Sequence, residues 1–434
     1  MSWYAWWIAR IVLAGMGSDA PAALDLTKAG ASMLAEVATR GDESLTLVAH
    51  DGSAASAAAL VEGAAMRSYR FDVYRTRLKD DQKQSVTALV GACDDPAAGD
   101  AAMNDVQGRL AGHYLARDLK HEPANILYPV SYAQRLKDEL EPVGVEVTII
   151  DEKQMEKEGW GALLGVGQGS IRDSAVVVMH WKGDTSGVNK DPVCFVGKGV
   201  TFDTGGISIK PAGGMEEMTM DMGGAGVVSG VMKTLALRKA KANVVGVVGI
   251  VENMPSGNAV RPGDVVTSMK GDKIEVVNTD AEGRLVLSDV LWYTQERFRP
   301  VGMINLATLT GAIIIALGHE NAGVFSNSDD LSGAFIKAAS AEGEGAWRMP
   351  LSAAYDKMIN CRIADMRNTG GGRDAGSITA AQFLARFVKP ETPWAHLDIA
   401  GVASIKGGTK LAPAGATGWG VMALNRLISD RYEA

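Results

Sequence analysis

The sequence has little of what usually marks a disulfide-rich or zinc-binding protein. Cys93, Cys194 and Cys361 are the three cysteines in 434 residues, and no two of them form a CxxC pair. Neither a disulfide framework nor a zinc ribbon is therefore expected, and a reducing cytoplasm fits this usage. The six histidines form no HExxH or similar pair. An imidazole-based zinc site is therefore not expected.

The sequence also lacks an excess of positive charge and a clear membrane segment. The formal net charge of -8 gives no reason to expect nucleic acid as an obligatory partner, although it does not exclude a local basic patch. The apolar start MSWYAWWIARIVLAG is interrupted by Arg10 and is shorter than the roughly 20 apolar residues of a membrane span. We expect no membrane association, and we expect Ile11 to Ala14 to form a buried strand.

Strand-like and helical segments alternate along the sequence, beginning in the first 100 residues. Strand-like runs start at Ile11, Leu45 and Val86, and Ala-rich helical runs cover residues 22–40 and 54–69. This pattern predicts a small α/β domain. Residues 94–105 are linker-like in composition, and residues 106–119 read as an amphipathic helix. The predicted organisation is an N-terminal domain over residues 1–100, a connecting helix over 101–118 and a larger domain over 119–434.

The larger domain is predicted to contain a mostly parallel mixed sheet. Short, β-branched runs indicate its strands, and these lie at residues 145–150, 175–180, 193–196, 243–251 and 302–307. Helical runs at residues 224–237 and 285–298 separate the later strands. Strands that alternate with helices are typical of an α/β fold whose sheet is covered by helices.

The stretch VVNTDAEGRL places three charges at alternate positions, Asp280, Glu282 and Arg284. On a helix these side chains would point to different sides, whereas an extended segment would place them on one face. Residues 274–277 are β-branched and read as the end of a strand, and a helix is predicted from residue 285. The three charges are therefore expected where a strand leads into a helix, which is the usual place for a site in an α/β sheet.

A second charged segment, VGKGVTFDTGGISIKP, carries Lys198, Asp203 and Lys210 among several glycines. It is not a phosphate-binding P-loop, because Lys198 is followed by glycine rather than by Ser or Thr. Farther along, Asp221 precedes a helix expected to start near Gly223. Taken alone, Asp221 is better explained as an acid that stabilises this helix N-terminus.

Together, four carboxylates are expected at strand ends or helix starts of one sheet: Asp203, Asp221, Asp280 and Glu282. Two unit charges at 4 Å repel by roughly 4 kcal/mol at an effective dielectric of 20. Divalent cations would remove this repulsion, so the pattern predicts a two-metal site able to hold zinc, manganese or magnesium. A two-metal phosphoesterase could use the same carboxylates, but no helix start with basic residues around it suggests a phosphate site.

At these motifs the chain resembles the leucyl aminopeptidase (cytosol aminopeptidase) family, the dinuclear metallo-aminopeptidases of peptidase family M17. The similarity covers most of residues 115–425. Its segments are EPANILYP, GKGVTFDTGGISIK, MDMGGAG, NMPSGNAVRPGDVVTSMKG, NTDAEGRL, ATLTGA, DAGSITAAQFL, HLDIAG and GATGWGV. The resemblance implies two divalent ions per chain, Mn²⁺ or Zn²⁺. Their implied ligands are Lys198, Asp203, Asp221, Asp280 and Glu282, with Asp203 and Glu282 bridging the ions.

The resemblance also implies roles for further residues. Lys210 would polarise the scissile carbonyl, and Arg284 would anchor a bicarbonate ion that acts as general base. A small, largely apolar pocket would hold the side chain of the N-terminal residue, and its implied lining is Met218, Thr308, Gly311, Ala400 and Ala403. Met218 could equally belong to the core.

By the same resemblance, the protein removes the N-terminal residue, preferably leucine or another apolar residue, from peptides with a free N-terminus. It would be a cytoplasmic homohexamer, a dimer of trimers, with an N-terminal domain that is macro-domain-like and apparently shortened. A second, non-catalytic role in DNA binding is known in the family, and the net charge of -8 argues against it here.

Overall fold

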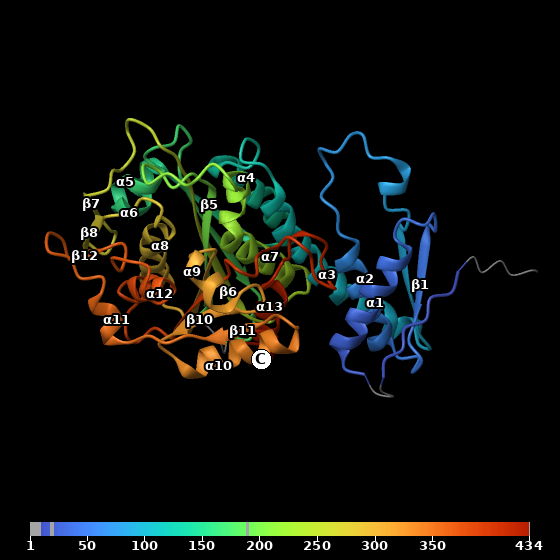
Figure 1. Cartoon of the computed structure of the whole chain (residues 1–434). Helices are drawn as coiled ribbons and strands as arrows, with labels where there is room; N and C mark the ends of the chain where they lie inside the picture. Colours follow the sequence, from blue (N-terminus) through green and yellow to red (C-terminus); the bar gives the residue numbers. More distant parts are fainter. Residues whose placement is uncertain (1–9, 18–20, 188–190, 434) are drawn as a thin grey trace, which may run out of the picture. The chain divides into compact units, whose positions relative to one another are not determined.

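The computed structural model describes residues 10–17, 21–187 and 191–433. They form two compact units, which Figure 1 shows with the chain coloured from blue to red. The first unit is Met1–Leu110 with Lys406–Gly415, and the second is Ala111–Ile405 with Ala416–Ala434. Within the described ranges, no helix has both the length and the apolar character needed to cross a membrane.

The first unit is built on two parallel strands covered by two closely packed helices. The helices approach so closely that a Cβ on Gly30 would lie 1.9 Å from the Leu60 carbonyl oxygen. Glycine is therefore required at this crossing. Its elements are α1 (Ala23–Val37), β1 (Ser44–Val48), α2 (Ala54–Ser68), a 3-10 helix (Asp80–Gln82) and β2 (Ala88–Ala92).

The expected strand at Ile11 to Ala14 is wrong. These residues have no regular structure, and Ile11 and Leu13 are 71% and 90% exposed. Only Val12 and Met16 pack partly against the core of the first unit. The apolar run therefore anchors the chain through isolated side chains, because no strand of the sheet pairs with it.

The expected linker over residues 94–105 is also wrong, because helix α3 (Pro96–His121) already starts inside it. Pro96 occupies the first helical position, where its missing N–H costs nothing. The Asp95 carboxylate accepts hydrogen bonds from the backbone N–H groups of Ala97 and Ala98. Such a cap starts a helix in a segment whose composition suggests a loop.

The second unit contains an eight-stranded mixed sheet, which confirms the predicted α/β class. Pairing is parallel through the central strands β13, β9, β5 and β6, and antiparallel where β10 meets β13, β6 meets β4 and β4 meets β3. In spatial order the strands are β11 (Ala346–Arg348), β10 (Ala322–Ser326), β13 (Trp394–Asp398), β9 (Gly302–Ala307), β5 (Val193–Asp203), β6 (Asn243–Asn253), β4 (Ala175–Lys182) and β3 (Glu146–Asp151).

Helices cover both faces of this sheet and create two separate apolar cores. One core includes side chains of α3, α4 (Pro129–Leu140), α7 (Gly223–Leu237), α10 (Asp329–Ala341) and α13 (Val421–Arg431). The other includes side chains of α5 (Glu152–Glu158), α6 (Gly161–Gly167), α8 (Gly283–Phe298) and α12 (Gly376–Ala385). The central strands are buried on both faces, which explains their continuous apolar sequences.

Short elements complete the second unit. A three-stranded sheet in the order β12-β8-β7 lies apart from the large sheet. The expectation that all four carboxylates follow one sheet is therefore wrong, since β8 leads to Asp280 and Glu282. These elements are β7 (Asp264–Thr267), β8 (Lys273–Val276), β12 (Met366–Arg367), β14 (Ser404–Ile405), β15 (Gly415–Ala416), α9 (Gly311–Leu317), α11 (Ala353–Lys357) and the 3-10 helices Glu141–Val143 and Met215–Met222.

Candidate metal centre

Strand β5 supplies two of the expected site residues, Lys198 and Asp203. Because side chains alternate along a strand, residues five positions apart would normally point to opposite faces. The register of β5 against β6 shifts between Val200 and Asp203, however, as in a β-bulge. This irregularity lets Lys198 and Asp203 line the same cavity.

Lys198 lies at the centre of the cluster. Its Nζ lies 2.7 Å from a carboxylate oxygen of Asp221 and 2.7 Å from one of Glu282, and it donates a hydrogen bond to the Thr308 carbonyl oxygen at 3.0 Å. One carboxylate oxygen from each of Asp203, Asp221 and Glu282 lies within 4.8 Å of the other two. Three acids from β5, the 3-10 helix Met215–Met222 and the start of α8 therefore converge.

The interpretation of Asp221 as a helix cap is wrong. Asp221 lies in the 3-10 helix before α7, and no side chain caps the N-terminus of α7. Its Oδ1 instead accepts hydrogen bonds from Lys198 Nζ at 2.7 Å and from Thr308 Oγ1 at 2.8 Å. The carboxylate is thus held toward the cavity rather than toward its own helix.

Lys210 connects the other two acids. Its Nζ lies 2.7 Å from an oxygen of Asp203 and forms a second ion pair with Asp280. The chain reaches Lys210 through a tight turn in which Gly205 and Gly206 have φ values of +87° and +66°. Residues with a Cβ rarely adopt this conformation, so the two glycines are needed to bring the lysine back to the strand end.

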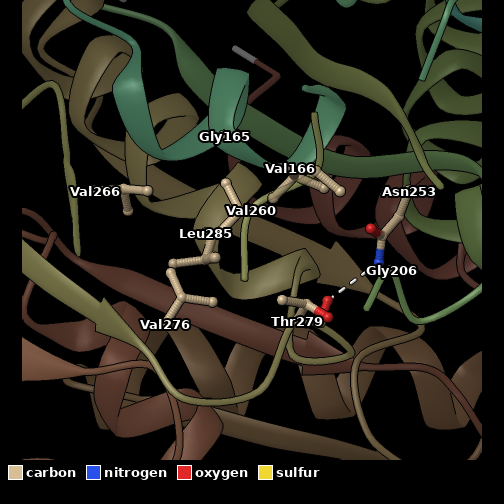
Figure 2. A pocket seen from close by; sticks show the side chains of 10 residues that line it. Gly165, Val166, Gly206, Asn253, Val260, Val266, Val276, Thr279 and Leu285 are labelled. Carbon is tan, nitrogen blue, oxygen red and sulfur yellow. Dashed lines mark hydrogen bonds between the residues drawn. The ribbon is translucent and has the colours of Figure 1, made fainter. Parts of the chain in front are cut away.

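The loop after Asp203 and the loop before Glu282 are tied together. The backbone N–H of Ser208 donates to Thr279 Oγ1 at 2.8 Å, and the N–H of Thr279 donates to Ser208 Oγ at 3.1 Å. Asn253 Nδ2 bridges both segments by donating to Asp203 Oδ1 at 2.7 Å and to the Thr279 carbonyl oxygen at 3.1 Å. Figure 2 shows this second bond beside a small, mostly apolar cavity of about 20 Å³. This cavity supports the loops and contains no charged side chain.

The expectation that Asp280, Glu282 and Arg284 share one face of an extended segment is wrong. Residues 278–281 form a turn, closed by a hydrogen bond from the Ala281 N–H to the Asn278 carbonyl oxygen, and Glu282 has helical dihedral angles. Their side chains contact different partners. Asp280 pairs with Lys210 and Glu282 with Lys198, whereas Arg284 Nη1 donates to the carbonyl oxygen of residue 368 at 2.8 Å.

Burial and neighbouring charges shift the pKa values in this cluster. Burial, reinforced by the charge of Glu282, raises the pKa of Asp203 to about 6, and burial also raises that of Asp221. Burial opposes ionisation of Glu282 as well, but Lys198 and Lys210 outweigh it and lower the pKa of Glu282. Both lysines keep a raised pKa because the surrounding carboxylates outweigh their burial. Two ammonium groups thus face four carboxyl groups, and uncompensated negative charge remains for a cation.

Arg284 differs from the lysines because it has no carboxylate partner within hydrogen-bond distance in the described structure. Burial lowers the pKa of its guanidinium to about 10, so the group is still cationic at neutral pH. Its Nε is buried and has no hydrogen-bond partner among the described residues. A buried cation with an unused donor is suited to hold a small anion.

The cluster forms the floor of a cavity of about 630 Å³. All five expected metal ligands, Lys210 and Arg284 line it. The expected side-chain pocket is brought together in part: Met218, Thr308, Gly311 and Ala400 line the cavity, whereas Ala403 does not. Ala403 is buried, 3.5 Å from where a Cβ on Gly223 would lie.

Some lining residues were not expected from the sequence. They are Ile314 and Ile315 of α9 and the segment containing Thr369, Gly370, Gly372 and Arg373. The glycine run before Arg373 was a usable signal, because it adjoins the DAGSITAAQFL segment that carries the resemblance. Nothing in the spacing of these residues relates them to the charged motifs, since over 80 residues separate Arg373 from Arg284.

The protein is an α/β protein whose helix-covered sheet carries, at the end of a central strand, a carboxylate cluster that could hold a metal ion. A model of the catalytic domain of the cytosol aminopeptidase family matches residues 114–425. The chain belongs to this family, and the resemblance seen in the sequence is confirmed. It is therefore an aminopeptidase, a hydrolase of peptide bonds.

Related proteins agree with this assignment. The chain is 62% identical over 410 residues to a probable cytosol aminopeptidase of Dinoroseobacter shibae, covering 94% of this chain and 81% of the relative. It is 55% identical over 430 residues to the Caulobacter vibrioides protein of the same description, covering 98% and 86%. Among solved structures, the bottromycin maturation enzyme BotP in complex with Mn is similar with a TM-score of 0.84 and 32% identity, covering 95% of this chain and 88% of BotP.

Proposed function

We propose that the protein is a two-metal aminopeptidase that removes leucine or another apolar residue from the N-terminus of peptides. The observation that carries this proposal is the convergence of Asp203, Asp221 and Glu282, with ligand atoms within 4.8 Å of one another, around a buried lysine. The similarity to BotP, which was solved in complex with Mn, supports a metal at the corresponding place. Manganese and zinc both suit such a ligand set.

The residues present fit two divalent ions. Asp203 and Glu282 would bridge them, Asp280 would complete one ligand set, and Lys198 with Asp221 would complete the other. Lys198 binds a metal only as a neutral amine, and the neighbouring dications would lower its pKa to allow this. Asp221 Oδ2 is buried and faces Lys198 Nζ at 2.7 Å, so a metal ion would take the place of this ion pair. When bound, the ions would lower the pKa of a water molecule, polarise the scissile carbonyl and hold the free α-amino group.

Two side chains of the chain itself would act on the reacting groups. The Lys210 ammonium group is one-fifth exposed and reaches the cavity, so it would donate to the carbonyl oxygen as negative charge develops there. Arg284 would hold a bicarbonate ion through its unused Nε, and that ion would accept a proton from the attacking water. Both groups are fixed before substrate arrives, because Lys210 is paired with two acids and Arg284 with a backbone carbonyl.

The preference for apolar residues follows from the wall of the cavity. Met218, Thr308, Gly311 and Ala400 line it, and none of them carries a charge. A methionine can adapt to leucine or methionine side chains of the substrate, since its unbranched chain fills irregular gaps. Ala403 does not line the cavity and instead packs near Gly223.

In the cell, we propose that the protein is a cytoplasmic homohexamer that acts on small peptides with a free N-terminus. Nucleic acid is no part of the proposed function, given the net charge of -8.

The test compares substrates and metal states. Purified protein loaded with manganese should hydrolyse Leu-p-nitroanilide, and it should not hydrolyse N-acetyl-Leu-p-nitroanilide, whose amino group is blocked. Chelation should abolish the activity, and added manganese or zinc should restore it. Hydrolysis of p-nitrophenyl phosphate instead of the anilide would identify a two-metal phosphoesterase. Full peptidase activity in metal-free protein would contradict the proposal.

A further inference from the structure

Arg373 differs from the other cations of the 630 Å³ cavity because it has no hydrogen-bond or ion-pair partner among the described residues. The lining contains Lys198, Lys210, Arg284 and Arg373. Carboxylates hold the two lysines, and Arg284 is buried against a backbone carbonyl. Arg373 is exposed, and within residues 10–17, 21–187 and 191–433 no group forms a hydrogen bond or ion pair with its guanidinium. It is thus a free positive charge at the wall of the site.

The loop that carries Arg373 is anchored on both sides. Before it, Arg367 Nη2 donates to the Met358 carbonyl oxygen at 2.9 Å and to that of Gly370 at 3.3 Å. After it, α12 begins and the Thr379 N–H donates to the carbonyl oxygen of Ala375 at 2.9 Å. Gly370 and Thr379 themselves line the cavity. Arg373 therefore lies between two ordered parts of the cavity wall.

The proposed reaction gives this charge an obvious ligand. A peptide bound with its amino group at the carboxylate cluster extends away from it and ends, if short, in a carboxylate. A guanidinium binds a carboxylate through two parallel N–H···O bonds. We propose that Arg373 binds the C-terminal carboxylate of short peptide substrates, which makes the enzyme selective for free-acid di- or tripeptides. This inference rests on the proposed aminopeptidase function and names its substrate class.

The geometry makes the effect depend on peptide length. A cavity of about 630 Å³ lies within the range of 300–1,000 Å³ that holds small ligands. Each added residue lengthens an extended peptide by about 3.3–3.6 Å. Only one length, or two adjacent lengths, can therefore place the carboxylate against Arg373 while the amino group stays at the cluster.

The experiment measures kcat/KM for Leu-Gly, Leu-Gly-Gly and Leu-Gly-Gly-Gly, each as the free acid and as the C-terminal amide. The manganese-loaded wild type is compared with Arg373→Gln, Arg373→Lys and the control Arg362→Gln, which replaces an exposed arginine that does not line the cavity. For one peptide length, the ratio of kcat/KM for the acid to kcat/KM for the amide should fall roughly ten-fold in Arg373→Gln, as expected for the loss of one charged hydrogen bond. The loss should appear as a higher KM for the acid. The acid-to-amide ratio of Arg373→Lys should lie between those of the wild type and Arg373→Gln. Lysine keeps the positive charge but cannot form the two parallel hydrogen bonds of a guanidinium.

The outcomes separate the two proposals. Wild-type protein that cleaves neither Leu-p-nitroanilide nor any of the leucyl peptides would overturn the aminopeptidase function, and this inference with it. If the wild type cleaves the peptides but the acid-to-amide ratio of Arg373→Gln equals that of the wild type at every length, the role of Arg373 is wrong and the function stands. An equal loss in Arg362→Gln would also overturn it, because a general effect of surface charge would then explain the result.

Discussion

The two motif lysines should behave differently when each is replaced by alanine, although the sequence places them only twelve residues apart. Lys198 is 2% exposed and lies between Asp221 and Glu282, whose side chains are 9% and 4% exposed. Lys210 is 20% exposed and pairs with Asp203 and Asp280 at the edge of the cavity. The first lysine is therefore part of a buried ionic cluster, and the second faces the cavity.

Replacing Lys198 leaves two buried carboxylates without their nearest cation. Breaking a buried ion pair in this way costs about 3–5 kcal/mol, so the free energy of unfolding of metal-free Lys198→Ala should fall by that amount. Its metal occupancy should also fall when metal is limiting, because one ligand is lost. Lys182→Ala is a suitable control, since it removes an exposed pair with Glu146 that should contribute about 0–1 kcal/mol.

Replacing Lys210 should instead affect turnover. The variant loses a cation aimed at the developing oxyanion, so kcat should drop by roughly 10²–10³ while metal content stays near two per chain. Metal analysis of the dialysed proteins, urea unfolding and steady-state kinetics with Leu-p-nitroanilide measure all three quantities. If Lys210→Ala loses a metal ion while Lys198→Ala keeps both, the assigned roles are wrong.

Three further predictions address the helix start, a buried acid and the assembly. Gly283→Ala should weaken metal binding in calorimetry while α8 stays folded, because the added Cβ would lie 2.5 Å from Lys198 Cε; unchanged affinity would contradict this. Burial raises the pKa of Asp289 to about 7, so the folded state binds more protons than the unfolded state between pH 3.8 and about 7, and wild-type stability falls as pH rises through this window. Asp289→Asn has no such carboxyl group, so its free energy of unfolding, measured with urea, should fall less over the same pH window. If the free energy of unfolding changes equally with pH in both proteins, other titrating groups cause the dependence. Light scattering should give six times the chain mass, and a stable, active monomer at micromolar concentration would exclude the proposed hexamer.

Much of the fold was predictable because the sequence patterns of its buried strands and helices are strong. The strands expected from Leu45, and over residues 243–251 and 302–307, are present with ends shifted by at most a few residues. The failures at Ile11 to Ala14 and at residues 94–105 have different causes. An apolar run forms a strand only if another strand pairs with it, and a side chain such as Asp95 starts a helix that composition alone does not reveal.

The candidate site was predictable as a set of charged residues but not as a geometry. The resemblance places the acids and lysines together, and the structure does bring them into one cavity. The β-bulge before Asp203 and the turn at residues 278–281 were not visible, because both depend on long-range hydrogen bonds such as those between Ser208 and Thr279. Arg373 was missed although its glycine run adjoins the DAGSITAAQFL segment, because a single arginine after glycines has no spacing that relates it to the charged motifs.

The pairing of two lysines with four acids has a consequence for how the enzyme is made. Many small metal-binding domains are unfolded until the ion arrives, because their ligands have nothing else to hold them together. Here the ammonium groups of Lys198 and Lys210 already bind the acids, and loops on both sides are tied by hydrogen bonds. Under the proposed metal dependence, the chain would therefore finish folding first and acquire the ion afterwards, so that scarcity of the ion would leave a pool of intact, dormant enzyme rather than a pool of degraded chains.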